Sequence, residues 1–353
     1  MGPPLLMNTD EPAISVVIPC RNEEAYISSC LDSLIGCDFS MEDLEIIVVD
    51  GMSDDRTPEV LLDYSRRYHF IRVFENPKKI TSAGLNLGIR KARGRYIVIL
   101  GSHSTVDRNF LKLNVEGLDL HDADCVGGQI VTLPAGRGVM ARSISLALSS
   151  PFGVGNASFR THPGRRRPVD TVPFGCYRRE VFKAGENLFD EELLRNQDDE
   201  FNLRLRKSGG KILLVPEICS YYYPRRTLLK LWRMYYQYGY FKPLVARKVG
   251  GVLTWRQAVP PLFICGLLAA GVLSITGKDP VFILLAAACY LIAALFFSAG
   301  IALKEGFRSS LALPLVFATL HFSYGFGYLK GLLDFFLLKK DKRNRIKEPI
   351  LTR

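Results

Sequence analysis

Residues 14–57 read ISVVIPCRNEEAYISSCLDSLIGCDFSMEDLEIIVVDGMSDDRT, and this stretch decides the fold. It opens with a short β-rich run over residues 14–20, and a second apolar run over residues 45–50 ends in an aspartate. Between the two runs, three apolar side chains recur at helical spacing: Ile27, Leu31 and Leu34. A strand, a helix and a second strand in this order predict a parallel pair, because parallel strands need a long crossover connection.

The alternation of strands and helices continues to about residue 100. The next helix has a predicted N-cap, a proline at its first position and an acid in its first turn: Thr57, Pro58 and Glu59. Residues 71–76 and 96–100 predict two further strands, and a helix from Ser82 is expected to stop at Gly94. The order predicts an α/β fold, a mostly parallel sheet with helices on both faces.

Ligands of such folds bind at the carboxyl ends of the strands. Three loops are expected there: Cys20–Glu24, Asp50–Thr57 and Gly101–Asp107. The first loop has no GxGxxG pattern, which excludes a dinucleotide-binding site. Asp50 stands where a carboxylate can accept hydrogen bonds from a base or a ribose, whereas Asp54 and Asp55 are expected to shape the loop as Asx turns.

The composition changes in the second half of the chain. Residues 218–278 contain no Asp or Glu, and eight arginines and lysines crowd the first part of this stretch. The net charge of +11 is therefore uneven, and no nucleic-acid-binding module accompanies it. A basic belt beside apolar segments is typical of a surface that faces anionic lipid, so we expect a membrane partner and no nucleic acid.

Three apolar stretches follow the basic belt, each near the ~20 residues that cross hydrocarbon: 259–276, 281–303 and 311–329. A buried helical core is the alternative, but no charge interrupts the first two stretches. All the basic flanks favour the cytoplasmic side, which three full crossings cannot satisfy. One stretch, such as the first with its Pro260 and Pro261, is thus a candidate for a re-entrant or interfacial segment.

The cysteines and the N-terminus predict the compartment. The eight cysteines form no CxxC pair and no zinc spacing, which suits a reducing environment. The first residues lack the basic start and the apolar run of a signal peptide. We expect a multi-pass protein of the inner (plasma) membrane with its catalytic domain in the cytoplasm.

Four motifs in order resemble the family-2 inverting glycosyltransferases of the nucleotide-sugar-binding (GT-A) fold: VVIPCRNEE, IIVVDGMSDDRT, GLNLGIRKARGRYIVIL and QDDEFNLRLRKSGGKI. The resemblance covers residues 13–245, and the C-terminal part is most similar to bacterial exopolysaccharide, succinoglycan-type glucosyltransferases. The implied organisation is an N-terminal tail (1–12), a GT-A catalytic domain (13–220), basic aromatic interfacial helices (221–257), about three transmembrane segments (258–338) and a basic tail (339–353).

The resemblance implies a nucleotide-sugar donor, with a UDP-hexose favoured, held by seven residues: Pro19, Arg21, Asn22, Glu24, Asp50, Asn86 and Ser102. In this family an Asp-x-Asp at the end of the fourth strand contacts the ribose and binds a divalent cation that bridges the diphosphate. Gly101 stands at the place of the first Asp and His103 at that of the last. Imidazole suits Mn²⁺ better than Mg²⁺, so His103 is the expected metal ligand and Mn²⁺ the favoured ion. A solvated loop histidine is the alternative.

The resemblance also places the catalytic acid. The stretch NQDDEFNLRLRK aligns with the family's Glu-Asp-x-Glu-Leu-x-x-Arg and puts Asp198 on the general base, with Gln197 in place of the preceding acid. An inverting transfer needs one carboxylate within hydrogen-bond reach of the acceptor hydroxyl. Asp199 is the second candidate for the general base. The alternative is that these acids form a solvated helix start without a catalytic role.

The acceptor side is expected to involve four residues: Phe174, Gly175, Arg225 and Arg226. The two arginines could meet the diphosphate of a polyprenyl-linked acceptor. The Gln-x-x-Arg-Trp pattern of processive relatives is absent, which predicts addition of a single sugar to a lipid-linked saccharide in polysaccharide biosynthesis. Two rival interpretations are a polyprenyl-phosphate glycosyltransferase and a catalytically dead nucleotide-sugar-binding scaffold, favoured by Gly101 and Gln197. The donor sugar, the linkage and the oligomeric state stay open.

Overall fold

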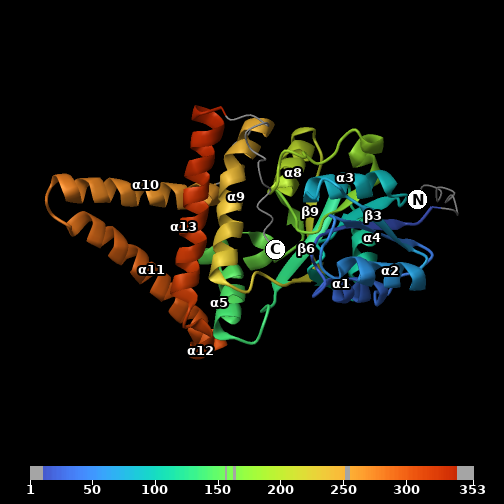
Figure 1. Ribbon diagram of the computed structural model, residues 1–353, viewed down its shortest axis with the longest axis horizontal. Helices are drawn as coiled ribbons and strands as arrows, with labels where there is room; N and C mark the ends of the chain where they lie inside the picture. Colours follow the sequence, from blue (N-terminus) through green and yellow to red (C-terminus); the bar gives the residue numbers. More distant parts are fainter. Residues whose placement is uncertain (1–10, 156, 162–163, 251–254, 340–353) are drawn as a thin grey trace. The chain divides into compact units, whose positions relative to one another are not determined.

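The computed structural model describes residues 11–155, 157–161, 164–250 and 255–339 (Figure 1). The expected terminal tails, 1–12 and 339–353, lie almost entirely outside these residues. The chain forms two compact units, each made of several segments. The first unit comprises Met1–Ile130, Pro163–Glu191 and Phe201–Tyr221, and the second comprises Val131–His162, Glu192–Glu200 and Tyr222–Arg353. The second unit thus takes two segments from the stretch that we expected to form one catalytic domain.

The first unit is built on a sheet with the strand order β3-β2-β1-β4-β8-β6-β9-β5, and β7 pairs with β9. Its strands are β1 (Ile14–Cys20), β2 (Leu44–Asp50), β3 (Ile71–Glu75), β4 (Tyr96–Ile99), β5 (Ser104–Val106), β6 (Cys125–Thr132), β7 (Arg167–Pro168), β8 (Cys176–Arg178) and β9 (Ile212–Tyr222). Strands β1 to β4 pair in parallel, and β8 runs antiparallel to β4 and β6. The predicted α/β fold with a mostly parallel sheet is confirmed.

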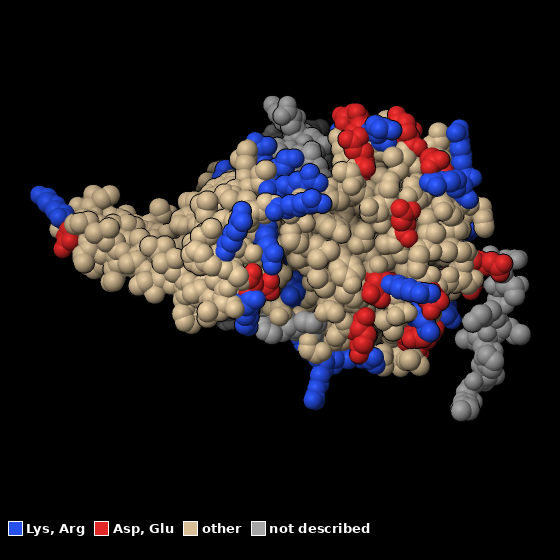
Figure 2. Space-filling model, turned by 90° about the horizontal axis from the view of Figure 1, so that it is seen from below, with Lys and Arg blue, Asp and Glu red and all other residues tan. Residues whose placement is uncertain are grey.

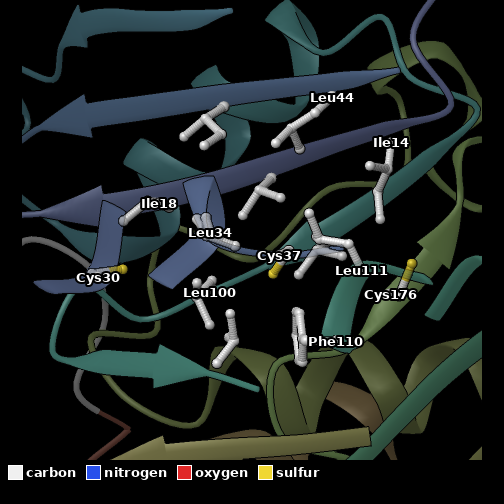
Figure 3. Close-up of a cluster of buried hydrophobic side chains, with 14 of the residues drawn as sticks. Ile14, Ile18, Cys30, Leu34, Cys37, Leu44, Leu100, Phe110, Leu111 and Cys176 are labelled. Carbon is white, nitrogen blue, oxygen red and sulfur yellow. The ribbon is translucent and has the colours of Figure 1, made fainter. Parts of the chain in front are cut away.

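Helices cover both faces of this sheet (Figure 1). They are α1 (Ile27–Ile35), α2 (Thr57–Arg67), α3 (Thr81–Lys91), α4 (Phe110–Leu120), the short η1 (Arg179–Gly185) and α8 (Gln197–Lys207), whose first turn belongs to the second unit. Alternate residues of β1 point to opposite faces. Ile14 and Ile18 join Leu34 of α1 in one buried cluster (Figure 3), whereas Val17 lies against Gly88 of α3. The predicted buried face of α1 is confirmed.

Two local expectations were wrong. Thr57 is the first residue of α2 and not its N-cap, because its hydroxyl accepts a hydrogen bond from the Glu23 N–H. Helix α3 ends at Lys91, so Gly94 is not its C-terminal glycine. Instead, Gly94 lies against β1, where its N–H donates to Ser15 Oγ at 2.8 Å. The tertiary contact, and not the helix end, requires the glycine.

Gly94→Ala should therefore destabilise the first unit. A Cβ at this position would lie 2.5 Å from Ser15 N, closer than non-bonded atoms approach. Overpacking of this kind costs about 1–3 kcal/mol of folding stability, which a thermal unfolding curve would detect. Gly138→Ala is the matched control, because no atom lies within 4 Å of the added Cβ. Equal unfolding midpoints for the two variants would contradict this account of Gly94.

The second unit is helical. Its helices are α5 (Val139–Leu148), α6 (Pro151–Val154), α7 (Ser158–Thr161), α9 (Leu228–Val249), α10 (Trp255–Thr276), α11 (Val281–Glu305), α12 (Phe307–Ser310), α13 (Leu313–Leu332) and the single turn η2 (Leu333–Leu337). Three segments are long and apolar enough to cross a membrane: Gln257–Thr276, Val281–Glu305 and Phe307–Leu337. They match the three stretches predicted from the sequence.

These three segments differ in how much of them the protein covers. In the most apolar part of Phe307–Leu337, half of the residues are buried, against 22% in Gln257–Thr276 and 11% in Val281–Glu305. Helix α13 packs side by side with α9 (Figure 1), and glycines bring the two backbones together. A Cβ on Gly239 would lie 2.1 Å from Tyr324 O, and one on Gly327 would lie 2.1 Å from Tyr236 O. Helices α10 and α11 instead form a largely uncovered hairpin.

Candidate active site

The loops after β1 and β2 are joined by hydrogen bonds at the carboxyl edge of the sheet. The register pairs Cys20 with the aspartate that ends β2, so both loops start at the same level. The Asn22 N–H donates to Ser53 Oγ at 2.9 Å, and the Glu23 N–H donates to Thr57 Oγ1 at 2.9 Å. The two expected donor-binding loops thus form one connected surface.

Both Asp54 and Asp55 shape this surface, Asp55 through the predicted Asx turn and Asp54 through bonds to the other loop. Asp54 accepts from Asn22 Nδ2 at 2.6 Å, and Asp55 accepts from the Thr57 N–H at 2.9 Å. Glu24 also bridges the loops, since its carboxylate accepts from the Arg56 N–H at 3.1 Å. Asn22 adopts a left-handed φ of 54°. Hydrogen bonds from its backbone N–H to Ser53 and between its side-chain amide and Asp54 hold this conformation in place. The loop geometry is therefore set before any ligand binds.

Asp50 is almost fully buried, with 6% of its surface exposed. Its carboxylate accepts hydrogen bonds from the Ser53 N–H and hydroxyl, which fixes the turn after β2. Arg21 lies beside it against Gly51, and the buried Nη1 of Arg21 has no hydrogen-bond partner among the described residues. A buried guanidinium nitrogen without a hydrogen-bond partner is suited to bind a ligand that has acceptor oxygens. The donor contacts of both residues stay predictions.

The remaining predicted donor contacts have structural surroundings of their own. Pro19 packs against α3, where a Cβ on Gly84 would lie 3.4 Å from Pro19 Cβ. Asn86 donates to Phe189 O at 2.9 Å and accepts from the Phe189 N–H at 3.0 Å, so its amide fastens this segment to α3. Ser102 is 3% exposed. Asn86 thus holds this segment against α3, and its contact with the donor stays a prediction.

His103 lies beside an acid that the sequence analysis did not single out. Its Nδ1 is 3.5 Å from Oε1 of Glu23, whose side chain is buried. The described residues contain no group of three His, Cys, Asp or Glu side chains that could hold a metal ion by themselves. His103 and Glu23 therefore fit a cation that takes most of its ligands from a diphosphate and from water.

Gly101 has a structural partner in Phe174. A Cβ on Gly101 would lie 3.2 Å from Phe174 Cε1, so the ring lies where the side chain of an aspartate would start. Phe174 has a φ of 46°, an uncommon conformation for a bulky residue. Close packing requires a glycine at position 175, because a Cβ on Gly175 would lie 2.9 Å from both Cys125 Sγ and the Tyr177 ring. This geometry does not support an acceptor contact at Gly175.

Asp198 stands in the first turn of α8, in the second unit. Its side chain keeps solvent access, but the surrounding protein and then the neighbouring Asp199 raise its pKa to about 6, against the opposing effect of Lys242. Asp199, in contrast, forms an ion pair with the buried ammonium of Lys242. A carboxylate with a pKa near neutrality is suited to general-base catalysis. The environment thus favours Asp198 over Asp199 for that role.

The two arginines expected on the acceptor side differ in exposure. Arg225 is 8% exposed, whereas Arg226 is exposed to solvent. Both belong to the second unit, as does Asp198, while the predicted donor and metal residues belong to the first. This difference in exposure could not be predicted from the sequence, because the two arginines are adjacent and identical.

A family profile described as "Glycosyl transferase family 2" matches residues 15–185. The chain carries a glycosyl transferase family 2 domain. This confirms the family that the four motifs resemble. The matched residues include both joined loops, His103 and Phe174.

Relatives resemble this chain over almost its whole length. It is 29% identical over 326 residues to a Methanococcus voltae protein named dolichyl N-acetyl-alpha-D-glucosaminyl phosphate 3-beta-D-2,3-diacetamido-2,3-dideoxy-beta-D-glucuronosyltransferase, covering 91% of this chain and 97% of the relative. It is 26% identical to the succinoglycan biosynthesis protein ExoA of Rhizobium meliloti, covering 91% and 95%.

Solved structures agree on the fold. The mannosyltransferase PcManGT of Pyrobaculum calidifontis, in complex with GDP-Man and Mn²⁺, gives a TM-score of 0.58 at 19% identity, covering 92% of this chain and 88% of the other. TarS 1–349 of S. aureus with UDP-GlcNAc gives 0.51 at 17% identity, covering 94% and 93%. These neighbours have the GT-A fold, in which a divalent cation is typical.

The raised pKa of Asp198 predicts a pH profile for a family 2 transfer reaction. The neutral acid cannot accept a proton, so kcat/KM should rise with pH and level off above about 6. Asp199→Asn removes the like charge and should move the rise to lower pH, whereas Lys242→Met removes the cation and should move it to higher pH. Steady-state kinetics between pH 4.5 and 8.5, an interval on the order of four pH units, would show both shifts.

The control for this profile is Asp63→Asn, because Asp63 is an exposed residue of α2 paired with Arg67. Its profile should match that of the unchanged protein. Profiles that shift together in all three variants, or that do not shift at all, would show that the titrating group is not Asp198.

Proposed function

We propose that this chain is a membrane-anchored inverting glycosyltransferase that moves one sugar from a nucleotide-sugar donor, with a UDP-hexose favoured, to a lipid-linked saccharide. The observation that carries the proposal is the placement of Asp198, an exposed carboxylate in the first turn of α8 whose neighbour Asp199 is separately paired with Lys242. The Methanococcus voltae relative is named for a dolichyl phosphate-linked substrate, and the Rhizobium meliloti relative is named for succinoglycan biosynthesis. The first name supports a lipid-linked acceptor, and the second supports a role in polysaccharide biosynthesis.

The proposed reaction is a single displacement. Asp198 removes the proton from an acceptor hydroxyl, the hydroxyl oxygen bonds to the anomeric carbon, and the bond from that carbon to the nucleoside diphosphate breaks. The anomeric configuration inverts because the carbon is attacked once, from the face opposite the leaving group. No second carboxylate nucleophile is needed. The absence of a Gln-x-x-Arg-Trp pattern favours addition of one sugar over processive synthesis.

The first unit is proposed to hold the donor. Asp50 and the buried Nη1 of Arg21 offer an acceptor and a donor at the edge where the two loops are joined. A divalent cation, with Mn²⁺ favoured over Mg²⁺, would neutralise charge on the leaving diphosphate when bound near His103 and Glu23. Gly101 stands at the place of the family's first aspartate, so one polar contact to the ribose is proposed to be absent, and the Phe174 ring crowds this position.

Attachment to the membrane is proposed to run through α10 and α11. Apolar side chains cover these helices, among them Leu268, Leu284 and Phe296, each at least 60% exposed. In Figure 2 the hairpin of α10 and α11 is almost free of charged side chains apart from its tip. Lys278 and Asp279 lie in the turn between the two helices. A hairpin returns both of its basic flanks to one side, which agrees with a multi-pass protein of the inner membrane whose catalytic domain is cytoplasmic.

Asp198→Asn is expected to bind the donor normally and to transfer almost nothing. The amide keeps the shape of the side chain but cannot take the proton, and loss of a general base costs about 10²-fold or more in rate. The measurement pairs transfer of radiolabelled sugar to lipid extracts with calorimetric titration of UDP. Asp63→Asn serves as the control for a charge lost elsewhere. A fully active Asp198→Asn enzyme would remove Asp198 from the mechanism.

Cysteine labelling tests the membrane hairpin. Cys265 of α10 and Cys289 of α11 are free and exposed, and in membranes the lipid should shield both from a water-soluble maleimide until the sample is denatured in SDS. A Cys219→Ser background removes the other partly accessible thiol. Lys278→Cys, at the tip, should react only from the face opposite the catalytic domain. Rapid labelling of Cys265 and Cys289 in intact membranes would contradict insertion.

A further inference from the structure

Helices α9 and α13 of the second unit run side by side in the same direction. The contacts between their backbones advance together along both helices. A Cβ on Gly327 would lie 2.1 Å from Tyr236 O, and one on Gly331 would lie 2.2 Å from Tyr240 O. Nearer the start of both helices, Leu231 of α9 joins the first turns of α13 in one buried cluster. Whatever orientation α13 takes in a membrane, α9 therefore shares it.

Charged side chains tie α9 to the segment that contains the proposed base. Lys242, which is 7% exposed, pairs with Asp199, and Lys248 pairs with Glu192. Both acids belong to Glu192–Glu200. Charges are costly in the hydrocarbon of a bilayer. Because α13 follows α9, it cannot cross the bilayer without taking these ion pairs with it.

Helix α10 meets α13 near its middle and then runs away from it (Figure 1). A Cβ on Gly325 of α13 would lie 2.6 Å from Ile264 Cγ1 and 2.9 Å from Pro260 O, both in the first half of α10. A bilayer that one of these helices spans therefore runs along the other. Residues 265–277 and 281–303 contain no charged side chain, and the protein covers little of α10 and α11. The hairpin is thus the part suited to enter hydrocarbon.

The side of α13 that α9 leaves uncovered carries an apolar stripe. Leu315, Phe326 and Leu333 are 55%, 42% and 41% exposed. Their spacings of eleven and seven residues correspond to about three and two helical turns, so they share one face. Phe322 belongs to the same face and contacts Phe263 of α10, with ring centres 5.6 Å apart. The hairpin thus leaves α13 beside the stripe.

Cations and an aromatic side chain lie next to the stripe on α9. The ring centres of Trp232 and Phe326 are 6.4 Å apart, and Arg233 and Arg247 are exposed, as is Arg308 of α12. Figure 2 shows lysines and arginines at the base of the hairpin. Apolar side chains flanked by tryptophan and cations are typical of a helix in the headgroup region of an anionic bilayer. A second copy of the chain is the other candidate occupant, but it would bring like charges together.

We propose that α13 does not cross the membrane: its apolar stripe lies on the cytoplasmic lipid surface, and only α10 and α11 enter the hydrocarbon. The inference rests on the proposed membrane attachment and gives α13 the interfacial place for which the sequence suggested α10. Two crossings return the chain to the side on which it started. The basic flanks that three crossings could not accommodate then all face the cytoplasm.

Single cysteines test whether α13 crosses. Cys219, Cys265 and Cys289 are first replaced by serine, because the other cysteines are buried. Arg308→Cys precedes α13 and Leu338→Cys follows it, both at exposed positions. An impermeant maleimide should label both from the cytoplasmic face only, and the matched Lys278→Cys at the hairpin tip from the opposite face only. Labelling of Arg308→Cys and Leu338→Cys from opposite faces would overturn the inference.

Fluorescence quenching tests whether lipid or a second copy covers the stripe. The fluorophore NBD is attached to Leu315→Cys, Phe326→Cys or Leu333→Cys, in vesicles that contain anionic lipid with a nitroxide at a shallow or a deep position of the acyl chain. The shallow nitroxide should quench all three most strongly and to a similar extent. Leu291→Cys, at an exposed position of α11, is the control and should be quenched most by the deep nitroxide.

Two quenching results would overturn the inference. Protection of the three α13 positions while Leu291→Cys is quenched would show that protein covers the stripe. A depth that changes steadily from Leu315→Cys to Leu333→Cys would show a crossing helix. The proposed membrane attachment fails separately, through a result in which neither nitroxide quenches any of the four positions.

Discussion

Parallel pairing of β1 with β2 and β4 is the constraint on which the first unit depends. Parallel strands end at the same edge, so the loops that follow them must meet there. The register that pairs Cys20 with Asp50 places both loops at one level, and the bonds from Asn22 and Glu23 then join them. A shift of one residue would exchange the β1 side chains that pack on α1 with those that pack on α3, so the two hydrophobic faces that secure the strand also fix the donor edge.

In the second unit, the surroundings of Asp198 determine how readily its carboxylate accepts a proton. Asp198 needs a pKa high enough to accept a proton, and the surrounding protein together with the charge of Asp199 raises that pKa. Lys242 opposes this rise, and its ion pair with Asp199 keeps the two acids distinct.

Features with a local signal were predictable from the sequence. The strands and the buried face of α1 follow from apolar periodicity, and the role of Asp55 follows from turn chemistry, whereas Asp54 bonds to Asn22 of the other loop. Thr57 and Gly94 were misread because a cap and a close contact between elements favour the same residue types. Only the folded chain showed that the Thr57 hydroxyl serves the neighbouring loop and that Gly94 faces β1.

The residues that sequence reasoning missed depend on contacts between distant segments. Glu23 gains significance only from its distance to His103, and Phe174 explains Gly101 although more than seventy residues separate them. Helix α13 is apolar like α10 and α11, and its packing on α9 is what distinguishes it from them. The four motifs identified the family, but the packing of these side chains could not be read from their spacing.

The central claim is that one carboxylate, Asp198, drives a single displacement at the anomeric carbon. The most direct measurement is proton NMR of the anomeric signal of the transferred sugar, recorded as the purified full-length protein turns over a nucleotide sugar with a polyprenyl-linked acceptor. The account predicts that the newly formed bond has the configuration opposite to that of the donor from the first turnover onward. A product that retains the donor's configuration would require two displacements and a nucleophile on the enzyme, which would contradict the account.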